Sequence, residues 1–374
     1  MHGEKFERMK KIIFFIDNLG SGGAQRQIVN TSIMLKNEGY AVSVLLYGDT
    51  PFYKHYLDDN NIPTILINPK GKLARLTQIR KYLRKSDADV VVAFLETPGF
   101  IACFSRMGGK VRWRLVTSER SAQENSFKSK KNKFFNWFER YSNAKVCNSE
   151  NAKRLWEKYY PQYKEKYSVI YNPVLIPDEI LNAEKDSTTT DKICLTVAAS
   201  YQGLKNPLRV IEAVSQLTTE QKQRLRLQWF GKTVVANEGS SVYDRARELV
   251  KEYGLEECVI LNEATKDIYQ IMKDSTAVGL FSTVEGLPNT ICEGMMLGKP
   301  IVMSKVSDYQ ILTDGNGILC EAESVESIKN ALIELLNSSP ERLKQMGEVS
   351  QEKAKKLFAQ KQITQQWIQL VENI

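Results

Sequence analysis

Histidine is nearly absent from this chain, which has only His2 and His55 among its 374 residues. A metal site built from several histidines is therefore excluded, and a Ser-His-Asp hydrolase would have to depend on His55 alone. The six cysteines are scattered without a Cys-x-x-Cys pair, as expected of reduced thiols in a cytosolic protein.

Long apolar runs are also missing. No stretch approaches the roughly 18 apolar residues of a membrane-spanning helix. The apolar run at 12–16 is too short for the core of a secretory signal peptide, and Asp17 ends it. We therefore expect a cytoplasmic protein without a membrane span.

The charge of the chain is unevenly distributed. Residues 1–185 carry 31 Lys and Arg against 19 Asp and Glu, whereas residues 186–374 carry 21 against 25. A length of 374 residues at about 150 per domain predicts two domains. The basic first half indicates a partner with negative charge: nucleic acid, an anionic membrane surface or a phosphate-bearing substrate.

Short apolar runs alternate with amphipathic stretches in both halves, which predicts parallel sheets covered by helices on both faces. In the first half, strands are expected at 12–16, 41–47, 64–67, 90–95, 114–117, 145–147 and 168–170. In the second half, strands are expected at 193–198, 225–230, 259–261, 277–281 and 300–303. The chain from about 324 onward is expected to be helical.

Two doubly wound, Rossmann-like α/β domains follow from this pattern. The polar hexamer 186–191 is the expected linker, which gives domains at 1–188 and 189–374. The last helix, at about 358–374, is expected to pack back on the first domain. Ligands of such sheets lie beyond the carboxyl ends of the strands, so a cleft between the domains is the expected site.

A glycine-rich stretch at 18–24, NLGSGGA, lies between the first expected strand and the first expected helix. Gly22 and Gly23 would let the backbone approach a ligand closely, and the helix start would offer N–H groups to an anion. The stretch is not a G-x-G-x-x-G match and lacks the lysine of a P-loop. An ordinary tight turn between strand and helix remains the alternative.

A second motif at 285–295, EGLPNTICEGM, follows another expected strand. Glu285 would lie in the loop and Glu293 in the first turn of the next helix, so both can line one wall of a cleft. A carboxylate accepts two hydrogen bonds from a diol, which suits sugar or ribose hydroxyls. Alternatively, Glu293 only favours the helix dipole and Glu285 is solvated.

The segment 281–307, FSTVEGLPNTICEGMMLGKPIVMSKVS, resembles the signature of retaining glycosyltransferases of family 4, which have the GT-B fold. The E-x7-E pattern of that family is matched by Glu285 and Glu293. The glycine-rich stretch resembles the first-domain loop of the family. The segment 199–207, ASYQGLKNP, resembles its second-domain phosphate-binding segment.

The resemblance implies a role for each matching position. Glu285 would contact hydroxyls of the donor sugar, Glu293 would hold the ribose, and Lys205 would neutralise the diphosphate. Asn172 falls where the family has an asparagine at the end of the first domain. The backbone groups implied to face the diphosphate belong to Gly22, Gly23, Leu287, Pro288, Asn289 and Thr290.

Two departures from the family pattern concern the chemistry. The family commonly has an arginine five residues before its phosphate lysine, and here that position is Ser200. Either another cation substitutes, or the leaving group is less well neutralised. Many members also have a histidine near 117–121, where this chain has Glu119. Glu119 could contact the donor sugar or the acceptor hydroxyl, and the alternative is a surface pair with Arg120.

No cofactor and no metal ion are expected. The sequence Asp87-Ala88-Asp89 matches the D-x-D of metal-dependent transferases, but it precedes a strand and so lies at the wrong end of the sheet for catalysis. The resemblance implies a mechanism in which Lys205, backbone amides and a helix dipole stabilise the developing negative charge.

The segment 127–137, FKSKKNKFFNW, combines basic and aromatic side chains. This mixture suits an anionic bilayer surface, although it could also serve single-stranded nucleic acid. Alternatively, part of the cluster is the buried face of a helix with a solvated lysine face, because helical spacing is followed by Phe134, Trp137, Phe138 and Tyr141. The residues expected to contact the membrane are Lys128, Lys130, Lys131, Lys133, Phe134 and Phe135.

These features together predict a retaining glycosyltransferase, peripheral on the inner face of the cell membrane. It would move a hexose or N-acetylhexosamine from a nucleotide diphosphate sugar to a lipid-linked saccharide, with no nucleic-acid partner. UDP is the first expectation for the nucleotide, and GDP-mannose remains open. One alternative is a dinucleotide-dependent oxidoreductase, with Asp49 as a weak candidate for the ribose. Another is a catalytically silent nucleotide-sugar-binding or membrane-adaptor protein, which Ser200 favours and the intact E-x7-E motif with Lys205 argues against.

Overall fold

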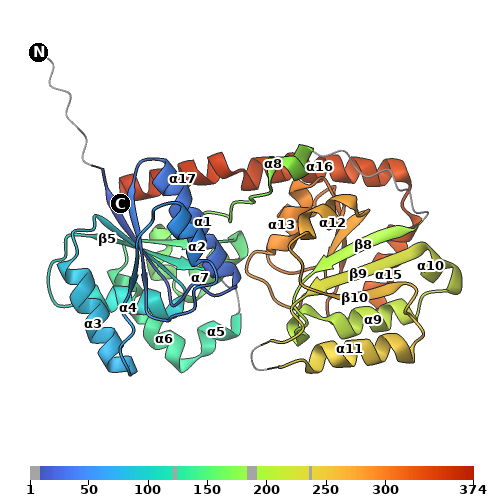
Figure 1. Ribbon diagram of the computed structural model, residues 1–374, viewed down its shortest axis with the longest axis horizontal. Coiled ribbons are helices and arrows are strands. Elements are labelled where there is room, and N and C mark those ends of the chain that lie inside the picture. Colours follow the sequence, from blue (N-terminus) through green and yellow to red (C-terminus); the bar gives the residue numbers. More distant parts are fainter. Residues whose placement is uncertain (1–8, 121–123, 183–191, 236–237) are drawn as a thin grey trace, which may run out of the picture. The chain divides into compact units, whose positions relative to one another are not determined.

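The computed structural model describes residues 9–120, 124–182, 192–235 and 238–374, which form two compact units (Figure 1). Unit 1 consists of Met1–Pro173 with Gln360–Ile374, and unit 2 of Val174–Ala359. None of the described helices has the length and apolar character needed to cross a membrane. All six cysteines are free.

Unit 1 is built on a seven-stranded parallel sheet in the order β3-β2-β1-β4-β5-β6-β7. All seven strands that the sequence predicts for the first half are present. Their bounds are β1 (Lys11–Phe15), β2 (Ala41–Leu46), β3 (Thr64–Leu66), β4 (Val90–Phe94), β5 (Arg114–Glu119), β6 (Ala144–Cys147) and β7 (Tyr167–Val169).

Helices cover both faces of this sheet, as the continuous apolar strands predict. Alternate side chains of β1 enter two separate cores, Ile12 and Phe14 in one and Ile13 and Phe15 in the other. The helical elements are α1 (Gly23–Asn37), α2 (Lys54–Asp59), α3 (Lys72–Lys85), α4 (Glu96–Arg106), α5 (Glu124–Lys128), α6 (Lys130–Trp137), η1 (Phe138–Tyr141), α7 (Glu150–Tyr159), η2 (Pro161–Lys166) and α17 (Gln360–Asn373).

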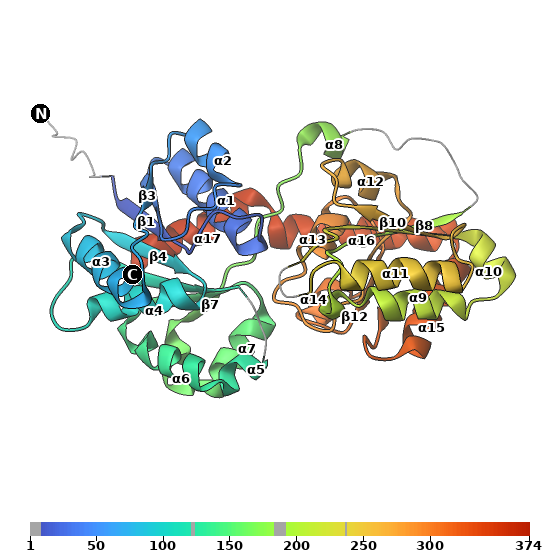
Figure 2. The same ribbon diagram turned by 60° about the horizontal axis from the view of Figure 1, so that its bottom comes forward.

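The C-terminal helix α17 belongs to unit 1, where it lies beside α1 (Figure 2). Trp367 is buried, and its ring stacks on that of Phe94 with centroids 6.3 Å apart. Lys10 pairs with Glu372 at 2.5 Å, which fixes the end of α17 beside the start of β1.

Unit 2 is built on a six-stranded parallel sheet in the order β10-β9-β8-β11-β12-β13. Its strands are β8 (Ile193–Ala198), β9 (Leu225–Gly231), β10 (Val259–Glu263), β11 (Ala277–Leu280), β12 (Ile301–Ser304) and β13 (Gly317–Cys320). Its helical elements are α8 (Asp178–Asn182), η3 (Gly203–Lys205), α9 (Pro207–Ser215), α10 (Thr219–Arg224), α11 (Ser241–Glu252), α12 (Ile268–Asp274), α13 (Asn289–Met296), α14 (Tyr309–Leu312), α15 (Val325–Asn337) and α16 (Pro340–Phe358). The edge strand β13 is the strand that the sequence analysis missed.

The boundary between the units lies after Pro173, so the expected boundary at 188/189 is wrong. The stretch before 183 is held by unit 2, because the Lys273 ammonium donates to the carbonyls of Ile180 and Leu181, the latter at 2.7 Å. The backbone N–H of Val174 likewise donates to the Phe358 carbonyl, at 3.1 Å. The expected linker at 186–191 lies outside the described residues.

Each sheet reverses its strand order once, between β1 and β4 in unit 1 and between β8 and β11 in unit 2. Ligands of open α/β sheets bind beyond the carboxyl ends of the strands at such a point. The glycine-rich stretch follows β1, the phosphate-type segment 199–207 follows β8, and the E-x7-E motif follows β11. The fold therefore places all three sequence motifs at these switch points.

Candidate active site

The segment after β8 is held in place by buried anchors. The Tyr201 ring is buried, and its hydroxyl donates to the Asn262 carbonyl at 3.0 Å. Asn206 has a left-handed backbone, with a φ of 71°, and its side-chain amide donates to the Ala322 carbonyl at 2.6 Å. Lys205 lies between these two anchors, at the end of η3.

Lys205 and Glu285 contact each other directly. The Lys205 Nζ lies 2.5 Å from Glu285 Oε1, and the Ser282 hydroxyl donates to the same oxygen at 2.7 Å. The Glu285 side chain is only 11% exposed, so the alternative of a solvated loop carboxylate is wrong. The ends of β8 and β11 thus bring a cation and a carboxylate together at the switch point of unit 2.

Glu293 lies one turn further into α13 than the sequence predicts, because the helix begins at Asn289 and has no acidic residue in its first turn. A carboxylate there gains little from the helix dipole, which acts within the first turn. Glu293 is buried at 8% exposure, and the Tyr269 hydroxyl on α12 donates to its Oε1 at 3.3 Å. Tyr269 is a site residue that no sequence motif indicates.

The position of Glu293 is fixed by close packing of α13 on the sheet. A Cβ at the neighbouring Gly294 would lie 2.8 Å from the Cβ of Val278 on β11, so only glycine fits without a shift. At the start of α13, the Thr290 hydroxyl donates to the Ala198 carbonyl at 2.8 Å, which ties the helix to the end of β8.

The start of α13 differs in one respect from the expected row of backbone donors. Pro288 has no N–H to offer an anion, and its carbonyl accepts from the N–H of Ile291 at 3.0 Å. The expected donors in this stretch therefore reduce to the N–H groups of Leu287, Asn289 and Thr290. The side chains of Leu287 and Pro288 are buried.

In unit 1, Gly22 caps α1 in an extended conformation, with φ −84° and ψ 162°, and Gly23 is the first residue of the helix. The φ of Gly22 is negative and any residue can adopt it. The glycine therefore provides space here, and its backbone conformation is an ordinary one. The Gln25 side chain fills part of this space and donates to Asp17 Oδ1 at 3.1 Å.

Glu119 ends β5 and is buried at 9% exposure, where its Oε1 accepts from the backbone N–H of Arg120 at 2.9 Å. It lines a cavity of about 20 Å³, the size of one water molecule, with Glu96 and Lys145. Burial, and then the charge of Glu119, raise the pKa of Glu96. Burial alone would lower the pKa of Lys145, but the carboxylates of Glu139 and Glu119 outweigh it and raise that pKa.

The alternative of a surface pair between Glu119 and Arg120 is wrong. The Arg120 guanidinium donates instead to the side-chain oxygen of Asn172 at 2.8 Å and lies 4.0 Å from the centre of the Phe94 ring. Burial lowers the pKa of Arg120. Asn172 is itself buried at 4% exposure, so this contact fixes the end of unit 1.

The basic and aromatic segment forms α5 and α6. Phe134 is 57% exposed and Trp137 45% exposed, so these two rings are not part of the buried face that the alternative describes. Phe138 is buried, and Phe135 stacks on Phe100 with centroids 4.2 Å apart. The four lysines expected to contact the membrane, Lys128, Lys130, Lys131 and Lys133, are all exposed.

The D-x-D pair occupies the turn between α3 and β4. The backbone N–H of Lys11 donates to Asp89 at 2.9 Å, its ammonium pairs with Asp87, and Arg112 lies 3.2 Å from Asp89. These carboxylates lie at the amino ends of β1 and β4, opposite the switch point, as the sequence predicts.

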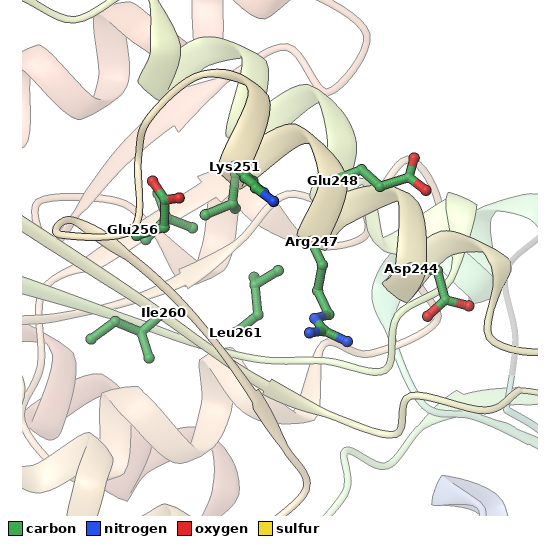
Figure 3. A pocket seen from close by; sticks show the side chains of 9 residues that line it. Asp244, Arg247, Glu248, Lys251, Glu256, Ile260 and Leu261 are labelled. Atoms are coloured by element: carbon green, nitrogen blue, oxygen red, sulfur yellow. The ribbon is translucent and has the colours of Figure 1, made fainter.

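A separate cavity of about 580 Å³ lies between α11 and the edge strand β10 (Figure 3). Charged side chains of α11, among them Asp244, Arg247 and Lys251, line one wall, and Ile260 and Leu261 of β10 line the other. It contains none of the motif residues, and β10 is two strands removed from β8. This cavity is therefore not part of the candidate site.

Comparison with known families agrees with this geometry. Residues 21–175 match the family model described as Glycosyltransferase Family 4, and residues 178–353 match that of Glycosyl transferases group 1. This chain belongs to the glycosyltransferases. The two models together account for both units, and the two Rossmann-like sheets are those of the GT-B fold.

Relatives of this glycosyltransferase are bacterial. An N-acetylgalactosamine-N,N'-diacetylbacillosaminyl-diphospho-undecaprenol 4-alpha-N-acetylgalactosaminyltransferase of Campylobacter jejuni is 27% identical over 349 residues, covering 88% of this chain and 90% of the relative. An uncharacterized glycosyltransferase of Haemophilus influenzae is 26% identical over 361 residues, covering 91% and 94%. HepE of Anabaena, solved with UDP, superimposes with a TM-score of 0.83 at 18% identity, over 98% of this chain and all of HepE.

Proposed function

We propose that this glycosyltransferase moves a hexose or an N-acetylhexosamine from a UDP-sugar to a lipid-linked saccharide, with retention of anomeric configuration. The observation that carries the proposal is the pairing of Lys205 with Glu285 after β8 and β11, with the buried Glu293 on the helix that follows β11. Two carboxylates suit the hydroxyls of a sugar and a ribose, and the ammonium suits a diphosphate.

The choice of substrates is supported by the relatives. The Campylobacter jejuni relative is named for transfer to a diphospho-undecaprenol-linked saccharide. A 23% identical relative from Escherichia coli, over 336 residues, is named for transfer of galactose from UDP-galactose to a diphosphoundecaprenol-linked N-acetylglucosamine. HepE was solved with UDP-glucose as well as with UDP. These names favour UDP over GDP-mannose for the donor.

In the proposed mechanism, the bond between the anomeric carbon and the diphosphate breaks while the acceptor hydroxyl attacks from the same face, and the proton of that hydroxyl passes to the departing diphosphate oxygen. Negative charge develops on the leaving diphosphate, where Lys205 and the N–H groups at the start of α13 stabilise it. Glu285 accepts hydrogen bonds from the transferring sugar, and Glu293 holds the ribose. We propose that no metal ion takes part, because Lys205 supplies a positive charge at this position.

Glu119 is the proposed contact to the donor sugar or the acceptor hydroxyl in unit 1. Its carboxylate lies at the carboxyl end of β5, in a polar cluster with Glu96 and Lys145. A buried carboxylate held by a backbone N–H is better oriented for this role than a solvated one would be.

The donor can be tested by the shift in melting temperature that nucleotide sugars produce. UDP-glucose, UDP-galactose and their N-acetyl forms are expected to raise it, because a ligand that binds only the folded state stabilises that state. A shift of similar size with NADH alone would favour the oxidoreductase alternative and contradict the proposal. A rise in melting temperature with GDP-mannose alone would contradict the choice of UDP.

A lipid-linked acceptor also requires contact with a membrane, and we propose that α5 and α6 provide it. Lys131 and Lys133 are exposed on the helix that also carries the exposed rings of Phe134 and Trp137. The expected ring of Phe135 is instead half-buried against Phe100. Lysines attract anionic headgroups, and aromatic rings favour the interface. The protein would then be peripheral on the inner face of the cell membrane.

Replacing the four lysines Lys128, Lys130, Lys131 and Lys133 by glutamine is expected to release the protein from vesicles that contain phosphatidylglycerol. Each lysine contributes roughly 1 kcal/mol at low salt, so the loss should reach up to about 4 kcal/mol. Sedimentation with vesicles over a salt series measures this loss.

The matched control replaces four exposed lysines at and near α3, namely Lys70, Lys72, Lys81 and Lys85. This variant loses the same charge and should keep most of its vesicle binding. Equal binding by both variants would contradict a specific role for α5 and α6. Both should retain activity on a soluble acceptor analogue.

A further inference from the structure

The proposed diphosphate site in unit 2 is short of positive charge. Lys205 lies 2.5 Å from Glu285, so its charge is already balanced within the protein. The side chain at Ser200, in the same segment, is uncharged and donates to Gln202 Oε1 at 3.2 Å. A diphosphate brings further negative charge to this position, which favours a second cation.

The segment that follows the neighbouring strand β9 places Lys232 directly opposite Ser200. β8 and β9 pair in parallel, with Ala198 opposite Phe230. The ladder continues beyond the strands, because the N–H of Ala199 donates to the Phe230 carbonyl at 2.9 Å and that of Tyr201 to the Lys232 carbonyl at 3.0 Å. Continuing this register puts Ser200 and Lys232 opposite each other, about 4.8 Å apart along the hydrogen-bonding direction.

Two further observations support this close approach of the two segments. A Cβ at Gly231 would lie 2.9 Å from the Cα of Ser200, so the glycine lets the two backbones come this close. Beyond Lys232, the same loop returns to the segment, where Glu238 Oε2 accepts from the N–H of Gly203 at 2.9 Å. Lys232 is exposed, and its flexible four-carbon stem allows its ammonium to reach a ligand at Ser200.

We propose that Lys232 supplies a second positive charge to the diphosphate of the donor, from the segment after β9 that runs beside the segment after β8 with Ser200. This inference rests on the proposed function, since it names a further residue of the same donor site. Lys232 and Lys205 would then contact the diphosphate from the end of β9 and from η3.

The test compares Lys232→Gln with the wild type by calorimetric titration of UDP, pyrophosphate and uridine. We expect Lys232→Gln to weaken UDP and pyrophosphate binding about tenfold and to leave uridine binding unchanged. Lys251→Gln, which removes an exposed lysine on α11, is the control and should bind all three like the wild type. Lys232→Arg should retain most of the affinity for UDP.

A rescue variant sharpens the test. In the Lys232→Gln protein, Ser200→Arg should restore binding of UDP, because it returns a cation to the same register position. Affinity that stays at the Lys232→Gln level in this double variant would contradict the placement. Equal losses for UDP and uridine would also contradict it, since they would indicate a disturbed loop and not a lost charge.

The outcome separates this inference from the proposed function. Wild-type protein that binds pyrophosphate but not UDP would contradict the proposed donor, while the pyrophosphate titrations still decide the role of Lys232. Wild-type protein that binds UDP, with unchanged binding in Lys232→Gln, would overturn the role of Lys232 alone.

Discussion

Lys205→Ala is expected to reduce the turnover number about a hundredfold. The ammonium stabilises the charge that develops on the departing diphosphate, and loss of one such contact costs on the order of 3 kcal/mol in the transition state. Steady-state rates with the donor found in the melting-temperature screen measure the loss. The wild-type rate should be insensitive to EDTA.

Two controls keep this result interpretable. Lys251→Ala removes an exposed lysine on α11 of the same unit and should leave the rate unchanged. Circular dichroism should show that Lys205→Ala is folded, since the Lys205 side chain remains 20% exposed. A wild-type rate for Lys205→Ala, or strong inhibition by EDTA that a divalent ion reverses, would contradict the metal-free mechanism.

Glu285→Ala and Glu293→Ala are expected to fail in different ways. Glu293→Ala should weaken UDP binding about ten- to a hundredfold, because a hydrogen bond to a charged group is worth roughly 1.5–3 kcal/mol. Glu285→Ala should reduce turnover more than UDP affinity, because its proposed partner is the transferring sugar. Calorimetric titration with UDP, combined with steady-state rates, separates the two effects.

The contact between Lys205 and Glu285 adds a condition to this prediction. Removing either partner leaves the charge of the other without this contact. The losses of turnover in Lys205→Ala and Glu285→Ala should therefore not be additive in the double variant. Tyr269→Phe is the control for Glu293, since it removes only the hydroxyl that donates to that carboxylate. Unchanged UDP affinity in Glu293→Ala and unchanged turnover in Glu285→Ala would contradict the assignment.

The sequence predicts the sheets well because their strands are buried on both faces. Runs such as Val90–Phe94 are continuously apolar, which is typical of a buried strand and not of a loop. The sequence does not indicate the edge strand β13, Gly317–Cys320, because it has only four residues and begins with a glycine. The domain boundary was misplaced because α8 is held by Lys273, a contact between residues that are far apart in sequence.

Helical periodicity describes only part of the aromatic cluster at α6. Phe134, Trp137 and Phe138 have the spacing of one continuous α-helical face. The α-helix ends at Trp137 and a 3₁₀ turn begins at Phe138, so the direction of the side chains changes there. Phe138 is buried, whereas Phe134 and Trp137 remain exposed.

The candidate site was predictable only where a short motif carries it. Glu285, Glu293 and Lys205 follow from local patterns, and the structure brings Lys205 and Glu285 together. Tyr269 and Lys232 do not, because their relation to the site depends on helix packing and on the register between β8 and β9. Such relations are set by the tertiary fold and leave no local pattern in the sequence.

The central claim is tested most directly by the anomeric configuration of the product. The full-length protein is incubated with the UDP-sugar found in the screen and with an undecaprenyl-diphosphate-linked saccharide, and the new glycosidic bond is assigned by NMR. The proposed function predicts a lipid-linked product whose new bond has the same anomeric configuration as the donor. An inverted bond would contradict the retaining mechanism, and donor turnover without any lipid-linked product would contradict the proposed acceptor.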